Sequence, residues 1–579
     1  MSNGFTQRMS WLHTWFGLVL GWVAFALFLT GTISIFWFEI SNWAQPELHG
    51  VKMLATPATV QYSLDYLRKV APDSKRWNVY MPDFERHPVL LLNWLDRNDA
   101  QHFVRLVPDG SGREVTTVTN GGRFFVDFHW TFNHVADPKA TAAEVRPLAE
   151  RLTFGWTYML SGFVGMAFLI GTITGLIIHK KIFSHFFTFR RDAKLPQTRW
   201  LDAHNVLGVL AWPFLFMIVL SGLVFYCYLY IPTGMQMAAR YPAPVVARVP
   251  EVGGPAMLWA RFSSGGQGSI VKGLPEPGNP APNVSIADLF TQAQEQMGTL
   301  SGFAVSNPNR DNAIVKFSGA RARPDVITFT PESMVFDGVT GHVLSPPGST
   351  SNAVKRVAYV FGGIHFGFYG GTAMRVLYFL CGAAGTMMID TGLVMFTTKR
   401  RAMAVHSAAA GRFYAFVERM NIACVGGSLF ACASYFWGLR LLPQSLSDPT
   451  GGFWEGVYAS IRVVPLDRAV RSDFELYVFW MAWGVAAVHA FMRAPHKAWA
   501  EQLAATAALC IGLPAIGYLV PNCDIGSMIK AGDWKIVAVD LSALTIGVML
   551  AWTAWKMSGK RVGLDVGKLG ETSGLSPAQ

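Results

Sequence analysis

The chain has 579 residues, of which 51% are hydrophobic and 15% are charged, and its formal net charge is +11. This composition indicates a polytopic α-helical membrane protein with sizeable soluble parts. A basic chain can bind nucleic acid, but here the Lys and Arg residues lie mostly in short segments between apolar runs. Membrane topology accounts for that distribution, so we expect a lipid bilayer around the chain and no nucleic-acid partner.

The predicted membrane helices follow the apolar runs of the sequence. Eight candidate spans lie near residues 11–36, 152–178, 204–230, 371–397, 415–439, 474–492, 501–520 and 535–556. The first run is too long for the core of a signal peptide, so we expect it to remain as a membrane anchor. The expected layout is a first span in 1–36, an outer module in 37–151, two spans with a basic loop in 152–230, a second outer module in 231–370, a fourth span in 371–397, a loop in 398–414, an extension of four spans in 415–556 and a tail in 557–579.

The loops between spans predict the orientation of the chain. Residues 179–203 and 398–414 are rich in Lys and Arg, which is typical of short cytoplasmic loops. This orientation places both termini in the cytoplasm and residues 37–151 and 231–370 on the outer side.

The two outer segments have similar patterns. Each has an amphipathic helix, at 62–70 or 286–297, followed by short strand-like runs. The runs are 77–81, 89–95 and 102–107 in the first segment, and 304–306, 313–317, 326–330 and the hairpin 336–344 in the second. A helix followed by an antiparallel meander predicts a small α+β module in each segment. The first 400 residues are therefore predicted to be a duplicated unit of helix, outer module and helix.

A histidine motif begins the first and third spans. His13 is followed by Gly31 after 18 residues, and His204 is followed by Gly222 after the same interval. Eighteen residues make five turns of α-helix, so each histidine shares a face with a glycine about 27 Å away. That length is close to the thickness of the hydrocarbon core of a bilayer. The motif predicts an imidazole near the inner surface and a notch near the outer one.

The second and fourth spans have the complementary arrangement. Their small-residue pairs, Thr174-Gly175 and Thr391-Gly392, lie at the inner ends. Histidines precede these spans on the outer side, namely His129 and His134 before the second span and His365 before the fourth. His129 and His134 are five residues apart, so they cannot both face one site on a regular helix. The residues alone do not decide between them.

Four histidines in two layers predict two haem sites. His13 and His204 form the inner layer, and His365 with His129 or His134 forms the outer layer. Two axial imidazoles favour electron transfer because no axial position stays open. The six cysteines form no Cys-x-x-Cys-His motif, so we expect non-covalent haem rather than c-type haem.

A purely structural role is the alternative for these residues. Histidines near helix ends are often interfacial, and glycines in membrane helices often serve close packing. The repeated spacing also follows from gene duplication alone. His179 is a rival ligand for the inner layer, although it equally fits the positively charged segment that ends the second span. Arg375 in the fourth span either reaches the interface or neutralises something buried, such as a haem propionate or an anionic chelate.

These motifs resemble those of a known family. The segments His13-Thr14-Trp15-Phe16-Gly17-Leu18, Asp202-Ala203-His204-Asn205-Val206-Leu207-Gly208 and Asp337-Gly338-Val339-Thr340-Gly341 are similar to those of the PepSY-associated transmembrane-helix proteins. The resemblance covers roughly residues 1–400, and the remainder resembles longer members with a C-terminal helical extension.

Within this family the chain resembles membrane reductases of the ferrioxamine-reductase (FoxB) type. The resemblance implies two haem b groups in a four-helix core of a bacterial inner-membrane protein, with the outer modules as periplasmic PepSY domains. It implies axial ligation by His13, His204, His365 and one of His129 and His134.

The expected function is therefore that of a ferric-siderophore reductase with no single catalytic residue. Electrons from a quinol or a cytoplasmic reductase cross the membrane and reduce siderophore iron to iron(II) in the periplasm. The sequence has no Gly-x-x-x-x-Gly-Lys-Ser/Thr motif, and no Gly-x-Gly-x-x-Gly follows a predicted strand, so the electron source is external. The alternatives are a non-enzymatic PepSY binding or sensing protein and a transporter for metal chelates.

Overall fold

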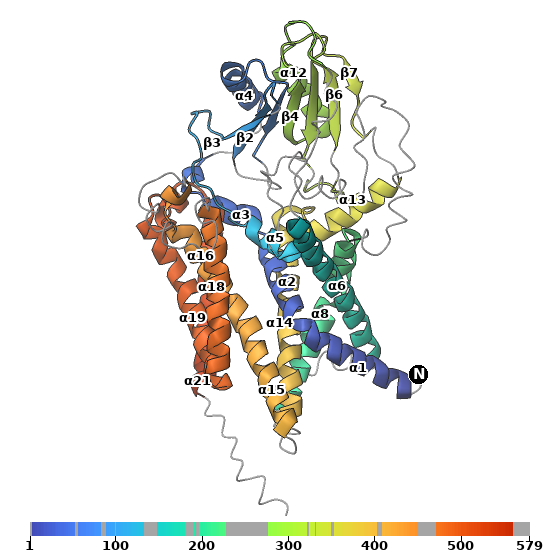
Figure 1. The fold of residues 1–579 in the computed structure, drawn as a ribbon, viewed down its shortest axis with the longest axis vertical. Helices are drawn as coiled ribbons and strands as arrows, with labels where there is room; N and C mark the ends of the chain where they lie inside the picture. The colour runs from blue at the N-terminus through green and yellow to red at the C-terminus, as the bar shows by residue number, and fades with distance from the viewer. Residues whose placement is uncertain are drawn as a thin grey trace, which may run out of the picture.

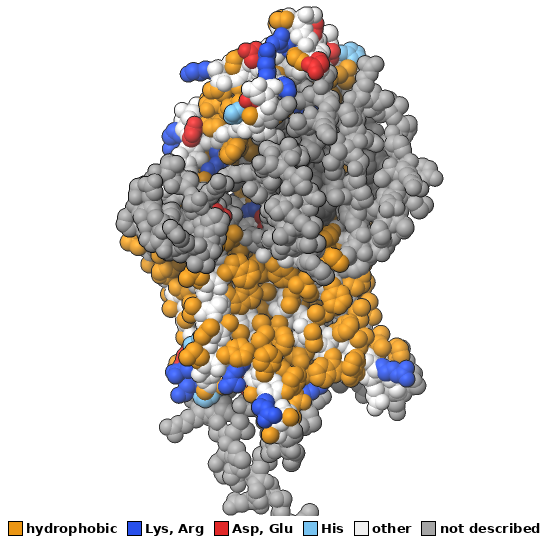
Figure 2. Space-filling view, viewed as in Figure 1, with side chains coloured by type: hydrophobic (Ala, Val, Ile, Leu, Met, Phe, Trp, Pro, Cys, Tyr) orange, Lys and Arg blue, Asp and Glu red, His pale blue; other side chains and the backbone are white. Residues whose placement is uncertain are grey.

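A β-sheet stands above a set of membrane helices in the computed structural model (Figure 1). The structure describes residues 3–51, 56–82, 89–98, 100–132, 148–179, 190, 196–226, 276–320, 323–329, 332–348, 353–401, 408–447 and 471–559. Hydrophobic side chains form a broad band over the helices below the sheet (Figure 2). Within the described residues, seven helices are long and apolar enough to cross a membrane, and a bent pair brings the total to eight.

Seven of the eight predicted spans fall on continuous helical segments. These are α6 (Leu148–Ile178), α8 (Pro196–Val224), α14 (Gly371–Arg401), α15 with α16 (Ala408–Asn421 and Gly427–Leu441), α18 (Arg471–Met492), α19 (Pro495–Ile516) and α21 (Trp534–Gly559). A π-helical turn at Ile422–Gly426 joins α15 to α16 without ending the helix.

The first predicted span, 11–36, is wrong as a single helix. α1 (Asn3–Val19) and α2 (Gly21–Ser34) meet at an angle of 65°, and α1 turns sideways from α2 in Figure 1. The turn lies where the chain approaches α14, since a Cβ atom on Gly21 would lie 2.9 Å from Leu393 Cδ2. His13 and Gly31 therefore do not share one helix face, and the separation of about 27 Å applies only to the continuous helix α8.

Both outer segments contribute to one antiparallel sheet of seven strands. The strands are β1 (Arg76–Tyr80), β2 (Leu90–Leu95), β3 (Gln101–Leu106), β4 (Leu300–Ser306), β5 (Ile314–Gly319), β6 (Ser333–Asp337) and β7 (Val343–Ser345), in the order β3-β2-β1-β4-β5-β6-β7. β1 of the first segment pairs with β4 of the second, with Trp77 opposite Val305. The two modules predicted from the sequence are thus not separate, because their edge strands pair with each other.

Two helices cover one face of this sheet. α4 (Pro57–Val70) and α12 (Ile286–Met297) share a buried core with alternate residues of the strands, including Leu64, Phe290 and Phe317. Each helix begins at a hydroxyl residue, Thr56 or Ser285, whose side chain accepts a backbone N–H from the first turn. The sheet and its two helices therefore form one layer of strands under one layer of helices.

The predicted strand at 326–330 is wrong. Its described residues lie against α13 (Ala353–Phe366), where the N–H of Phe329 donates to the carbonyl of Tyr359 over 2.9 Å. A Cβ atom on Gly363 would overlap the carbonyl oxygen of Ile327. The apolar residues of this loop therefore join the sheet to the helices instead of adding a strand.

The C-terminal extension forms a bundle beside the other helices (orange to red in Figure 1). Asn421 connects it to the core, because its side chain accepts from Trp22 Nε1 at 2.7 Å and donates to the carbonyl of Leu393 at 3.0 Å. Nearer the sheet, Trp43 of α3 (Trp37–Trp43) donates to Asp540 of α21 over 3.2 Å.

Gly302 should be required for the join between β1 and β4. It has a φ of 155°, and a Cβ atom there would overlap the carbonyl oxygen of Val79. Gly302→Val should therefore separate the two strands, and amide hydrogen exchange in β1 should become faster. Ala304→Val in the same strand is the control and should leave that exchange unchanged. Equal exchange in the two variants would contradict this account of the join.

Candidate functional site

Two histidine pairs lie at different depths among the helices. The far pair, away from the sheet, consists of His13 on α1 and His204 on α8, whose ring centroids are 6.3 Å apart at an interplanar angle of 71°. The sheet pair consists of His129 on α5 (Arg123–Thr131) and His365 on α13, with centroids 6.3 Å apart at 25°. About 20 Å of α8 separates His204 from Ile218, which contacts His365.

The far pair is held by backbone carbonyls of the second and fourth spans. His13 Nδ1 lies 3.0 Å from the carbonyl oxygen of Gly171 on α6 and 3.3 Å from Thr174 Oγ1. His204 Nδ1 lies 2.8 Å from the carbonyl oxygen of Met388 on α14. Each ring is thus oriented by a helix other than its own.

The sheet pair is held in the same way. His129 Nδ1 lies 2.7 Å from the carbonyl oxygen of Leu27 on α2. His365 Nδ1 lies 3.0 Å from the carbonyl oxygen of Ile218 on α8 and 3.3 Å from Ser221 Oγ. The first and third spans therefore orient the histidines that precede the second and fourth.

The four contacts fix the protonation of each ring. A carbonyl oxygen only accepts hydrogen bonds, so each Nδ1 carries the proton and donates it. Each Nε2 then keeps a lone pair and is the nitrogen available to a metal. Histidines that bind metals are commonly oriented by this second hydrogen bond.

Each imidazole rests against a glycine. A Cβ atom would lie 3.2 Å from His13 Cε1 if placed on Gly175, 3.1 Å from His204 Cε1 on Gly392, 2.6 Å from His129 Nδ1 on Gly31 and 2.8 Å from His365 Cε1 on Gly222. Gly31 and Gly222 were predicted as notches, and the group that each notch receives is the edge of an imidazole.

One sequence pattern produces all four contacts. The accepting carbonyl lies four residues before the glycine, and a Ser or Thr stands directly before the glycine. The pairs of acceptor and glycine are Leu27 and Gly31, Gly171 and Gly175, Ile218 and Gly222, and Met388 and Gly392. Each hydroxyl donates to the same carbonyl, at 2.9–3.2 Å. Sequence reasoning missed these carbonyls, although the repeated hydroxyl–glycine pair was a signal for them.

Both pairs fit a metal held between two imidazoles. Metal–nitrogen bonds of about 2.0 Å on both sides of one ion separate the ring centroids by about 6 Å, and the observed separation is 6.3 Å in each pair. No group of three or more His, Cys, Asp or Glu side chains that could hold a metal occurs in the described part of the chain. Two imidazoles per pair are the donors that haem iron takes from a protein, because the macrocycle supplies its other ligands.

Aromatic and aliphatic side chains fill the region between the pairs. The rings of Phe28 and Phe168 lie 4.5 Å apart, and those of Phe214 and Tyr378 lie 5.1 Å apart. They surround buried Leu215 and small residues of α8 and α14. The space between α2, α6, α8 and α14 is therefore filled by close-packed, mainly apolar side chains.

The histidines of the sheet pair are half-buried and neutral. Burial lowers the pKa of His129, and it lowers the pKa of His365 to about 4. Both rings are therefore uncharged at neutral pH, which is the form that binds a metal.

The other predicted ligands have different positions. His134 lies outside the described residues, and His129 is the histidine that faces His365. His179 follows α6 and is close enough to His204 for their charges to interact. The ring paired with His204 is that of His13.

Arg375 has a partner within the protein. Its Nη1 and Nη2 donate to the two carboxylate oxygens of Glu39, each over 2.6 Å, and its Nε and Nη2 donate to the carbonyl of Ile35. Both side chains of this ion pair are 7% exposed. Glu39 balances the charge of Arg375, and the pair joins α3 to α14. A role of Arg375 toward a haem propionate or a chelate stays a prediction.

Most of the chain matches one family model. The model described as the PepSY-associated TM region covers residues 10–399. The chain belongs to this family. No curated protein matches it. The part of the chain that the PepSY-associated TM region covers contains both histidine pairs, their four glycines and every described strand, whereas the extension from α15 onward lies beyond it.

Removing the charge of Glu39 should reveal the cost of burying Arg375 alone. Glu39→Gln keeps the shape of the side chain but leaves a buried guanidinium without its counter-charge, so it should lower stability by about 3–5 kcal/mol. Thermal unfolding in detergent measures the loss. Glu501→Gln removes an exposed ion pair with Arg493 and should change stability by about 1 kcal/mol or less. If both variants unfold alike, the Glu39 pair does not hold α3 to α14.

Proposed function

We propose that this protein is a di-haem b reductase that carries electrons across the membrane to a ferric siderophore on the side of the sheet. The observation behind this proposal is the arrangement of four imidazoles in two pairs, each with centroids 6.3 Å apart. His13 and His204 would hold one haem, and His129 and His365 the other. A haem with two imidazole ligands supplies one-electron transfer and leaves no axial position for a substrate.

The chain's own groups prepare these sites. The hydrogen bonds from Nδ1 to helix carbonyls hold the rings in the tautomer that offers Nε2 to a metal. The glycines let each ring approach the neighbouring helix closely enough for that bond. The apolar packing between the pairs excludes water, which limits leakage of ions and protons through the core.

Contacts around His365 support an electron exit toward the sheet. The rings of Phe225 and Phe366 lie 5.5 Å and 5.7 Å from the imidazole of His365. Phe366 in turn packs on Phe329 at 4.7 Å, in the loop that joins the sheet to α13. A chelate docked near the sheet would thus lie above the sheet pair. One electron converts its iron(III) to iron(II), which hard oxygen donors bind more weakly.

The electron donor acts at the far pair in this proposal. The sequence has neither a phosphate-binding loop nor a dinucleotide fingerprint, so a quinol or a cytoplasmic reductase would supply the electrons. The basic residues that follow α6 and α14 in the sequence favour the cytoplasmic side for the end of the helices that holds the far pair. The protein would then lie in a bacterial inner membrane with the sheet in the periplasm.

Two other functions compete with this one. A metal-chelate transporter needs a polar route, whereas the residues around Leu215 between the pairs are aromatic and apolar. A non-enzymatic binding or sensing protein needs only the sheet and gives the histidines a packing role. Haem content separates this last alternative from the reductase.

Purified protein from haem-sufficient cells should contain two b-type haems per chain. His13→Ala and His365→Ala should each remove one haem, because each leaves a pair with a single imidazole. A reduced-minus-oxidised absorption spectrum, with haem counted against protein, measures this. His342→Ala changes an exposed histidine of the sheet and should retain both haems. Folded wild-type protein without haem would contradict the proposal and favour binding or sensing.

A ferric hydroxamate siderophore should reoxidise the reduced protein under anaerobic conditions, with one haem oxidised per iron reduced. The gallium(III) complex of the same siderophore has the same charge and shape but accepts no electron, so it should leave the haems reduced. Stopped-flow absorption follows the haems, and an iron(II) chelator detects the product. If the ferric complex behaves like the gallium complex, the substrate assignment fails even though the two haems are present.

Gly222 should be required for the sheet-pair haem alone. The side chain of Gly222→Val would displace His365, since its Cβ would lie 2.8 Å from His365 Cε1. The variant should lose one haem and retain the far-pair haem. Gly484→Val on α18 is the control, because a Cβ atom there has open space. Retention of two haems by Gly222→Val would contradict the role given to this glycine.

A further inference from the structure

The C-terminal extension packs on the helix that carries His129. Phe124 and Phe128 of α5 are at most 1% exposed. The ring of Phe124 lies 4.3 Å from that of Tyr435 on α16, and the ring of Phe128 lies 5.4 Å from that of Phe479 on α18. α5 therefore contacts the extension through its phenylalanines while it contacts α2 through His129.

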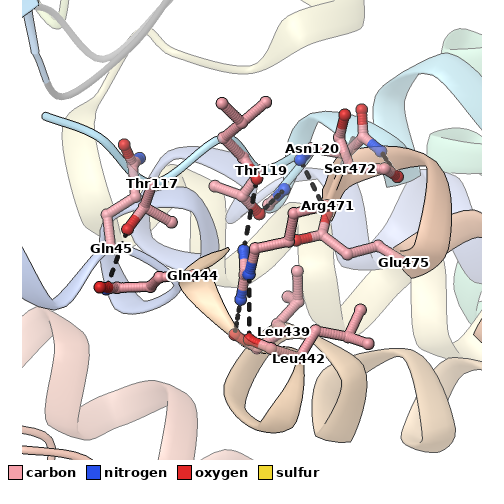
Figure 3. A network of polar contacts seen from close by, with 12 residues as sticks. Gln45, Thr117, Thr119, Asn120, Leu439, Leu442, Gln444, Arg471, Ser472 and Glu475 are labelled. Carbon is pink, nitrogen blue, oxygen red and sulfur yellow. Dashed lines mark hydrogen bonds and ion pairs between the residues drawn. The ribbon is translucent and has the colours of Figure 1, made fainter. Parts of the chain in front are cut away.

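The extension also holds the segment that leads into α5 (Figure 3). The backbone N–H of Asn120 donates to Glu475 Oε2 at 2.8 Å, and its side chain donates to the carbonyl of Ser472 at 2.7 Å. The hydroxyl of Tyr435 donates to the carbonyl of Gly121 at 2.8 Å. Three hydrogen bonds thus fix Asn120 and Gly121, the two residues before Gly122, which is the N-cap of α5.

A buried ion pair orients the carboxylate in this contact. Arg471 Nη1 donates to Glu475 Oε1 at 2.7 Å, and the two side chains are 3% and 0% exposed. Arg471 also donates to the carbonyls of Leu439 and Leu442 at the end of α16. Buried ion pairs add little stability compared with apolar packing, so their contribution here is to fix the position of Glu475 and hence of Asn120.

α5 needs such support more than the helices of the other three histidines. It has nine residues and ends at Phe132, which has a left-handed conformation with a φ of 54°. Isolated helices of this length are unstable in water because too few hydrogen bonds offset the cost of nucleation. His13, His204 and His365 lie on helices of 17, 29 and 14 residues.

We propose that the extension is a positioning device for His129. Tyr435, Glu475 and Arg471 hold the start of α5, and the contacts of its phenylalanines stabilise the rest of the helix. The imidazole of His129 is thereby kept opposite that of His365. This inference rests on the proposed function, because it ties Tyr435, Glu475 and Arg471 to the sheet-pair haem and not to the far-pair haem. It also gives a role to residues that lie outside the matched family region.

The first test uses haem-free protein, so it does not depend on electron transfer. Tyr435→Phe and Asn120→Ala each remove one side-chain hydrogen bond from this contact and leave the buried Arg471–Glu475 pair intact. Hydrogen exchange of the amides of α5 should become about fivefold faster in each variant, the effect expected for one lost hydrogen bond. Glu501→Gln, in the extension but in contact with Arg493 and His489, should leave α5 unchanged. Equal exchange in all four proteins would overturn the proposal.

The second test uses haem-loaded protein and compares the two sites. In a His13→Ala background only the sheet-pair haem should remain, and Tyr435→Phe should shift its midpoint potential. In a His365→Ala background only the far-pair haem should remain, and the same substitution should leave its potential unchanged. Equal shifts at both sites would mean a general loss of structure and would overturn the positioning role. If no haem binds at all, the proposed function fails, and the exchange experiment still decides whether the extension positions His129.

Discussion

Both sites depend on one interaction, the hydrogen bond from an imidazole to a helix carbonyl that lies four residues before a glycine. A carbonyl inside a helix already accepts from the amide four residues later, and the side chain of that later residue normally covers it. Glycine at that position uncovers the second lone pair, so the Nδ1–H of a histidine from another helix can reach it. The same interaction occurs four times, at 2.7–3.0 Å. It determines the position, the tautomer and the free nitrogen of each ring together.

The two halves of the duplicated unit build these contacts in a regular way. His13 and His129 rest on glycines of the first half, and His204 and His365 rest on glycines of the second. Each pair nevertheless takes one ring from each half. The sheet follows the same rule, since β1 of the first half pairs with β4 of the second. The junction between the halves therefore contains both histidine pairs and the centre of the sheet.

Much of this arrangement is predictable from local sequence signals, and the rest is not. Apolar length locates the spans, and the spacing of His204 and Gly222 identifies a helix face, because both signals act within one helix. The bend between α1 and α2 lies where Gly21 packs against Leu393 of α14, and a contact between distant helices leaves no signal in local periodicity. The pairing of β1 with β4 joins strands more than 200 residues apart, so no periodicity within either segment reveals it. The position of His129 likewise depends on α2, because the Leu27 carbonyl of that helix accepts from His129 Nδ1.

The repeat of the unit in one chain also has a consequence for substitutions. A single unit of helix, outer module and helix contains the glycines for two imidazoles but only half of each pair and half of the sheet, so it could complete them only as a symmetric homodimer. In such a dimer every substitution would appear on both sides of the axis at once. Joining the two copies in one chain removes that constraint. The rings now meet at 71° in one pair and 25° in the other, and α5 and α13 differ in length. A covalent tandem can thus adjust one ligand of a pair while its counterpart stays the same.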